Sequence, residues 1–172
     1  MRRLTAAMLL TLVVIAPACR TRKKGSRAQD DGKPLSVVNV ADPRGAVQLI
    51  RGFHNVENDS WRWAMRNFTV SLRPPAGAAT NGATLQLKFT LPDAIFSQLG
   101  AMTIHARVAG TDLAPETYSK AGEAIYSRDL PAAALQGDAV TIEFFTDKAL
   151  PPGPTDEREL SIIVSSIGLS PK

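Results

Sequence analysis

Alternation of apolar and polar residues is the feature that most limits how this chain can fold. From about residue 35 onward, apolar residues recur at every second position, the period of a β-strand with one buried face. The clearest stretches cover residues 68–72, 85–91, 104–108, 140–144 and 160–164. Weaker stretches cover residues 35–40, 47–50, 61–65 and 124–130. The pattern therefore predicts about eight or nine short strands.

Two further signals refine this prediction. Ile167 and Leu169 continue the last stretch in the opposite phase, which predicts a β-bulge near Ser165 and Ser166. Only residues 93–100 have the spacing of a short helical turn, with Gly100 as its C-cap. Short antiparallel strands joined by Gly-, Pro- and Asn-rich turns indicate an all-β fold, an antiparallel, jelly-roll-like β-sandwich, with a closed barrel as the alternative.

The amino terminus reads as an export signal. Arg2 and Arg3 precede an apolar stretch at residues 4–15, and the small residues of 16–18 follow it. The stretch is about 12 residues long, whereas a membrane span needs about 20. We expect residues 1–18 to be a signal peptide. The alternatives are a buried helix or an uncleaved anchor, the latter because a basic segment follows directly.

Cys19 is the only cysteine, and it stands directly after this predicted cleavage point. Its position resembles the lipobox of bacterial lipoproteins, which implies a lipid anchor on Cys19 and a place at the bacterial cell envelope, facing the periplasm or the exterior. Ala16 and Pro17 depart from the usual lipobox residues, so secretion after cleavage behind Ala18 is the alternative. Residues 19–34 would then form the lipid-attachment cysteine and a disordered basic tether, and residues 35–172 the folded domain.

The charge distribution argues against a nucleic-acid partner. The whole chain carries a net charge of +4, but residues 1–33 contain eight Lys or Arg and only two Asp. The remaining residues carry a net charge of −2, so the basic character belongs to the leader and tether.

The chain lacks the motifs of familiar catalytic and metal sites. Its two histidines, His54 and His105, are far apart, and it has no CxxC, HExxH, P-loop, G-x-S-x-G or G-x-G-x-x-G motif. We therefore expect no metal, no cofactor and no enzymatic activity. A hydrolase with an unrecognised pair of carboxylates stays open as an alternative.

One short segment gathers most of the chemically distinctive side chains. Residues 52–63 contain both tryptophans, Trp61 and Trp63, together with His54, Glu57 and Arg62. Aromatic faces stack on sugar rings and polar neighbours bind hydroxyl groups, so the segment is a candidate ligand site. The alternative is a structural cluster of core tryptophans with an ion pair, which is the commoner use of such residues.

The spacing of this segment resembles a small β-sandwich module that accompanies bacterial glycosyltransferases and methyltransferases of surface-polysaccharide assembly. The motif G-F-x-x-x-E-x-x-x-x-R-W begins at Gly52, and the closing motif Asp-x-Arg-x-Leu-x-Ile begins at Asp156. Leu91-Pro92, Tyr118, Ala121-Gly122 and Leu130-Pro131 extend the resemblance. It implies a galactose-binding-like fold and, by analogy, carbohydrate recognition.

These observations predict an exported, lipid-anchored carbohydrate-binding domain whose ligand contacts are His54, Glu57, Trp61, Arg62, Trp63 and Arg158. We expect Glu57, Arg62 and Arg158 to form one charged cluster. Lys88, His105 and Arg107 alternate outward and are interpreted as solvent-facing. The rival interpretation is a structural or protein-interaction lipoprotein without a small ligand.

Overall fold

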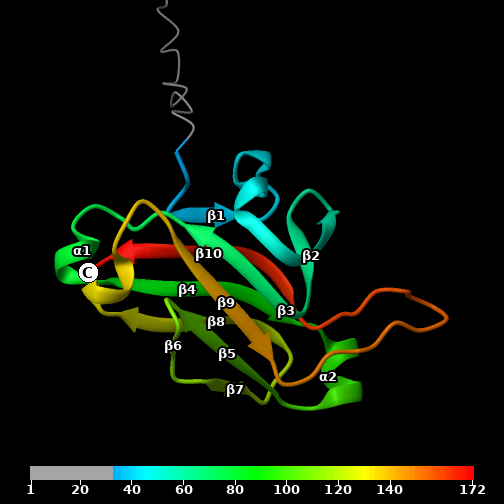
Figure 1. Cartoon of the computed structure of the whole chain (residues 1–172). Helices are drawn as coiled ribbons and strands as arrows, with labels where there is room; N and C mark the ends of the chain where they lie inside the picture. The colour runs from blue at the N-terminus through cyan, green and yellow to red at the C-terminus, as the bar shows by residue number, and fades with distance from the viewer. Residues whose placement is uncertain (1–32) are drawn as a thin grey trace, which may run out of the picture. The chain divides into compact units, whose positions relative to one another are not determined.

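The computed structural model describes residues 33–172, and the predicted signal peptide, Cys19 and most of the predicted tether lie outside the described residues. This part of the chain consists mostly of strands (Figure 1). The strands are β1 (Val37–Asn39), β2 (Leu49–Glu57), β3 (Trp61–Leu72), β4 (Ala83–Leu91), β5 (Met102–Val108), β6 (Thr111–Asp112), β7 (Glu116–Tyr118), β8 (Gly122–Leu130), β9 (Val140–Thr146) and β10 (Ile163–Pro171). The helices are short: η1 (Pro43–Gln48), α1 (Ala78–Asn81), α2 (Asp93–Leu99) and η2 (Ala132–Leu135).

The strands form one antiparallel sheet with the order β6-β5-β9-β3-β10-β4-β8, to which β1, β2 and β7 add by pairing with β10, β3 and β5. The sheet curls over on itself. Tyr126 on β8 and Phe144 on β9 are on strands that do not pair, yet their ring centroids lie 6.3 Å apart. The layer of β8, β4 and β10 therefore packs on the layer of β3, β9 and β5 (Figure 1), which confirms the predicted all-β, sandwich-like fold.

The core follows the predicted alternation. On β4 every second residue is buried, from Leu85 through Leu87 and Phe89 to Leu91. Phe144 stacks on Phe68 of the neighbouring strand with ring centroids 5.0 Å apart. Burial of each such side chain contributes about 1.5–3 kcal/mol to the stability of the core.

Two local predictions are confirmed. The pairing of β10 with β4 shifts register between Val164 and Ser166, at the predicted bulge. The bulge changes the phase of burial, so that Val164 and Ile167 both face the core. The helical turn at residues 93–100 is α2, with Gly100 at its C-cap at a φ of 71°.

Other local predictions are wrong at their edges. Residues 47–48 belong to η1, because Pro43 opens a 3-10 turn there, and the strand begins only at Leu49. The last strand begins at Ile163, because Leu160 pairs with Leu150 across the preceding loop instead. The strands β6 and β7 have only two and three residues, too few to show alternation in a sequence.

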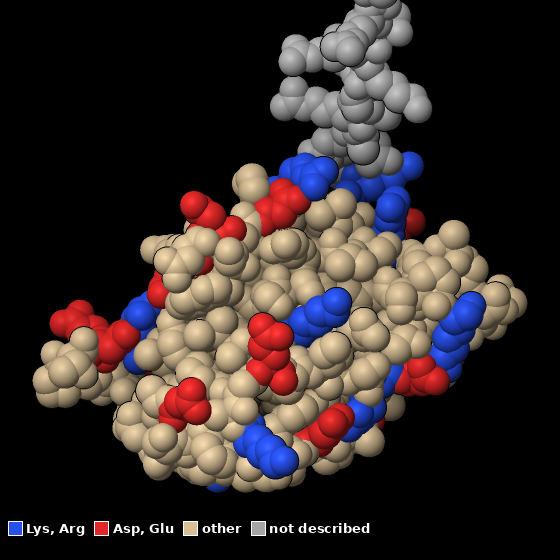
Figure 2. All heavy atoms as spheres, turned by 180° about the vertical axis from the view of Figure 1, so that it is seen from behind, with Lys and Arg blue, Asp and Glu red and all other residues tan. Residues whose placement is uncertain are grey.

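One face of the domain carries charges of both signs. Figure 2 shows one face of the molecule, on which acidic and basic side chains are interspersed and not gathered into a patch of one sign. Within residues 33–172, no helix is long and apolar enough to cross a membrane.

Candidate functional site

The first predicted site residues lie on the hairpin of β2 and β3. Asn58 and Asp59 make its turn with φ values of 49° and 50°, a left-handed conformation that these two residue types tolerate well. The tight turn places Glu57 opposite Trp61 in the ladder. The turn thereby fixes the position of the first residues of β3, and β3 also pairs with β10 there, through Trp63 and Ile163.

Trp61 lines a surface groove of about 570 Å³, which we call the Trp61 groove. The groove lies over the outer side of β10, β4 and β8. Its lining residues are Ser60, Trp61, Lys88, Phe89, Thr90, Glu123, Ala124, Ile125, Ile163 and Ser165. The indole of Trp61 is partly exposed there. Trp61 meets Trp63 edge to face, with centroids 6.1 Å apart, and Trp63 packs against the core.

The strand register explains which polar groups surround the indole. Ile163 pairs with Thr90, and Thr90 pairs with Glu123, so these three side chains form one row on the same side of the sheet. Lys88 is two residues from Thr90 and therefore lies on the same side. Lys88 and Glu123 are exposed, and neither side chain has an ion pair within residues 33–172. An ammonium donor and a carboxylate acceptor are thus both available beside an aromatic ring.

Arg158 and Glu57 meet as predicted. The Nη1 atom of Arg158 donates to the Oε1 atom of Glu57 over 2.6 Å, and Arg158 also donates to both carboxylate oxygens of Asp156. The hydrogen bonds from Arg158 lower the pKa of Asp156 to about 2. The hydrogen bonds that Arg158 donates to Asp156, and in second place to Glu57, raise the pKa of Arg158 above its usual value.

The predicted charged cluster is only partly present, because Arg62 is not paired with Glu57. Arg62 donates instead to the main-chain carbonyls of Val40 and His54, over 2.7 and 2.9 Å. These bonds fasten the segment after β1 to the hairpin. We therefore correct the expectation of one cluster: Glu57 and Arg158 form an ion pair, and Arg62 is a separate structural anchor.

His54 also makes a main-chain contact. Its Nε2 atom lies 2.8 Å from the carbonyl oxygen of Glu159, in the long loop between β9 and β10. Of the six predicted contact residues, Trp61 alone is among those that line the Trp61 groove. The other five support the hairpin, the loop or the core. Ligand binding by these six residues stays a prediction.

The residues that line the groove together with Trp61 were not identifiable as its neighbours from the sequence. Lys88 is exposed, as its predicted solvent-facing position requires, and Ser165 lies at the predicted bulge. The sequence made no prediction for Thr90 or Glu123. The outward alternation of β4 was the available signal for Lys88 and Thr90. Nothing in the sequence indicates that β4 and β8 would lie beside Trp61, because that neighbourhood depends on the order of the strands.

Acidic side chains are few in the Trp61 groove. Glu123 is the one carboxylate among its lining residues. Within residues 33–172, no group of three or more His, Cys, Asp or Glu side chains is placed to hold a metal ion.

A scan of family models and a search of curated proteins found no match. Among solved structures, the chain is similar to an acetyl xylan esterase from the rumen bacterium Butyrivibrio proteoclasticus, at 10% identity and a TM-score of 0.45. The match covers 81% of this chain but 34% of the esterase, so this chain spans about a third of that protein. It is also similar to the CBM36-1 domain of a multidomain xylanase from the hindgut metagenome of Trinervitermes trinervoides, at 11% identity and a TM-score of 0.35, over 69% of this chain and 86% of that one.

At these scores the likeness carries no conclusion about activity. The predicted link to glycosyltransferases and methyltransferases stays a prediction, whereas the sandwich-like fold is established by the strand arrangement itself.

Proposed function

We propose that this domain is a carbohydrate-binding module and that the Trp61 groove is its binding site. The observation that carries the proposal is the partly exposed indole of Trp61 in an open groove that also contains Lys88 and Glu123. A sugar ring has an apolar face of C–H groups and a rim of hydroxyls. An aromatic wall with a few convergent polar groups is complementary to both.

The polar groups suit hydroxyl groups in particular. A hydroxyl both donates and accepts hydrogen bonds, whereas an ammonium only donates and a carboxylate only accepts. Lys88 and Glu123 therefore satisfy both functions of a sugar hydroxyl. Thr90 adds a hydroxyl that can do either, whereas Ser165, whose Oγ donates to the Lys88 carbonyl over 3.2 Å, adds an acceptor. Hydrogen bonds to charged partners contribute about 1.5–3 kcal/mol each, enough to orient the ring.

The site continues beyond the indole, which favours a chain of sugars over a single one. A smaller depression of about 180 Å³ shares Lys88 with the Trp61 groove and extends past Gln86 and Ser166 to Val37. It follows β10 and β4 along their length. An extended oligosaccharide lying along these strands would contact Trp61 at one end and Gln86 at the other.

Binding to a glycan array, followed by titration calorimetry on the best ligand, tests this proposal. We expect Trp61→Ala to weaken binding at least tenfold, equivalent to about 1.4 kcal/mol. Trp61→Tyr is the matched control, because it keeps an aromatic face and should retain most of the affinity. Lys88→Ala and Glu123→Gln should each weaken binding severalfold. Full affinity in Trp61→Ala would refute the groove as the site.

The remaining predicted contacts fit a supporting role. Glu57 and Arg158 tie the long loop to the hairpin, Arg62 holds the segment after β1, and Trp63 packs on the core. These contacts are what the alternative function, a structural or protein-interaction module, would need. Loss of stability without loss of glycan binding in Arg62→Ala would assign that residue to the fold alone.

We further propose that the protein acts at the bacterial cell envelope without catalysis, attached through a lipid on Cys19. The support is the basic, apolar and small-residue order of the first 19 residues. Two acyl chains with a basic flank are sufficient for stable anchoring.

Cys19→Ser should move the protein from the membrane to the soluble fraction and abolish metabolic labelling by a fatty acid. Absence of label in the unaltered protein would refute the anchor, and release of reducing sugar from bound glycan would refute the absence of catalysis.

A further inference from the structure

Another depression, separate from the Trp61 groove and from the smaller depression beside Lys88, lies on the outer side of β3, β9 and β5. We call it the Phe145 depression; its volume is about 440 Å³, and its side-chain lining includes Arg51, Asn67, His105, Arg107, Glu143 and Phe145. None of these residues lines the Trp61 groove. From the sequence, His105 and Arg107 are predicted only to face the solvent.

The Phe145 depression and the Trp61 groove face away from each other. Tyr126 and Phe144 point inward from β8 and β9, because their rings meet in the core. Neighbouring residues on a strand point to opposite sides, so Ile125 and Phe145 point outward from the two layers. Ile125 lines the Trp61 groove and Phe145 lines the Phe145 depression. A ligand in one therefore does not block the other.

The register arranges the Phe145 depression in two rows. Phe145 pairs with Asn67 on one side and with His105 on the other, so the ring lies between two polar side chains. His105 lies 5.5 Å from the Phe145 ring centroid, and the Arg66 guanidinium lies 4.9 Å from it. Asn67 and His105 are exposed, and their side chains make no hydrogen bond to residues 33–172.

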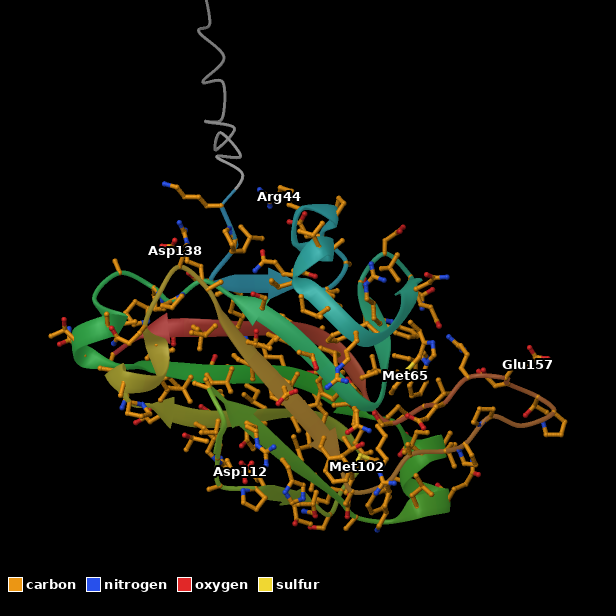
Figure 3. All side chains as sticks on the ribbon, viewed as in Figure 1. Arg44, Met65, Met102, Asp112, Asp138 and Glu157 are labelled. Atoms are coloured by element: carbon orange, nitrogen blue, oxygen red, sulfur yellow. The ribbon has the colours of Figure 1, made fainter. Side chains whose placement is uncertain are left out.

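The second row presents charged donors and acceptors side by side. The Nη2 atom of Arg51 lies 3.3 Å from Oε1 of Glu143, and Arg107 donates to both carboxylate oxygens of Asp112. Glu143 pairs with Arg107 in the ladder, so the acid stands between two arginines. Asp112 lies at the lower edge of the sheet in Figure 3.

The two positive charges of Arg51 and Arg107 balance the two negative charges of Glu143 and Asp112. The row therefore does not select an anionic or a cationic ligand. Arg51 and Glu143 are exposed and their contact is long, which leaves donor and acceptor positions open. The paired donors and acceptors match the hydroxyls of a neutral sugar, and the part of the Phe145 ring that Arg66 does not cover matches its apolar face.

We propose that the Phe145 depression is a second saccharide-binding site, for a neutral glycan segment, on the opposite face from the Trp61 groove. This inference extends the proposed function but rests on a separate set of residues. Asn67 and His105 contact the ligand directly, and the Arg51–Glu143 pair binds its hydroxyls.

Affinity electrophoresis of the full chain tests the proposal, in gels that each contain xylan, mannan, galactan or mixed-linkage glucan. The variants are Trp61→Ala, the double variant Asn67→Ala/His105→Ala, and the triple variant that combines them. Lys120→Ala is the control, because Lys120 is exposed and lines neither site. Circular dichroism melting of each variant verifies that it is folded.

We expect Trp61→Ala to keep part of the retardation in at least one gel, and the triple variant to lose all of it. The double variant should lose at least threefold in affinity in that gel, while Lys120→Ala behaves like the unaltered protein. If Trp61→Ala alone abolishes retardation in every gel, the second site is wrong and the Trp61 groove stands. If only the double variant loses retardation, the second site stands and the Trp61 groove is wrong. If the unaltered protein is not retarded in any gel, both are wrong.

Discussion

Arg158 and Glu57 are 101 positions apart in the sequence, and a 2.6 Å hydrogen bond joins the Nη1 atom of the first to the Oε1 atom of the second. The bond ties the long loop between β9 and β10 to the end of β2. The loop projects from the sheet in Figure 3, with Glu157 on its outer part. His54 and Arg66 also hold it, the first at the carbonyl of Glu159 and the second, through its main-chain amide, at the Glu159 carboxylate.

The ion pair itself should contribute little to global stability. The side chains of Arg158 and Glu57 are 37% and 33% exposed, so solvent screens their attraction. We expect Arg158→Ala to lower the free energy of unfolding by about 1 kcal/mol or less. The rate of proteolytic cleavage within the loop should rise more clearly, because the loop loses one of the contacts that hold it to the hairpin. Chemical denaturation and limited proteolysis measure the two effects, and a loss of several kcal/mol would show that the pair is more important than its exposure indicates.

Arg62→Ala should cost more than Arg158→Ala. It removes two charge-assisted hydrogen bonds to the partly buried carbonyls of Val40 and His54, which we expect to cost about 1.5–3 kcal/mol. Since Arg62 and Arg158 share no hydrogen-bond partner, their losses should add within about 0.5 kcal/mol in the double variant. Denaturant unfolding of the four proteins measures this, and a larger coupling would restore the single charged cluster.

Asp156 should make the domain sensitive to acid. Its pKa falls from 3.8 to about 2 in the folded state through the bonds from Arg158, so folding favours the ionised form. The stabilisation is therefore complete above about pH 4 and is lost as the pH falls through about 2. Asp156→Asn should flatten the decline of the free energy of unfolding between these values. Asp138→Asn is the control, because Asp138 is exposed; an equal effect of both variants would contradict the assignment.

Gly52 should tolerate no side chain. Its φ is 79°, and a Cβ there would overlap the carbonyl oxygen of Asn67 and lie 2.7 Å from the Cα of Phe68. We expect Gly52→Ala to destabilise the domain by about 3–5 kcal/mol, the sum of left-handed strain and overpacking. Gly110 has the same φ with nothing within 4 Å, so Gly110→Ala should cost only about 1–2 kcal/mol. Thermal and denaturant unfolding compare the two, and equal losses would mean that strain alone accounts for Gly52.

The strands and their inner faces follow from local patterns and were predictable. A strand side chain points to one of two faces, so the alternation on β4 identifies Leu85 and Leu87 as core without knowledge of any partner strand. The phase change at Ser165 and the short helix ending at Gly100 are equally local. The first residues of β2 and β10 were less predictable. They depend on a 3-10 turn before β2 and on a β-bridge in the loop before β10, both of which tertiary contacts stabilise.

The composition of the candidate sites was decided by the tertiary structure. Trp61 was identifiable from its segment, but Lys88 and Glu123 become its neighbours only because β10 inserts between β3 and β4 in the sheet. Glu57 and Arg158 pair because the long loop returns to the hairpin, whereas Arg62, next to Trp61 in sequence, points to carbonyl groups on other segments. Strand order is set by the combined burial of all the apolar faces, a property of the whole chain that no single segment encodes.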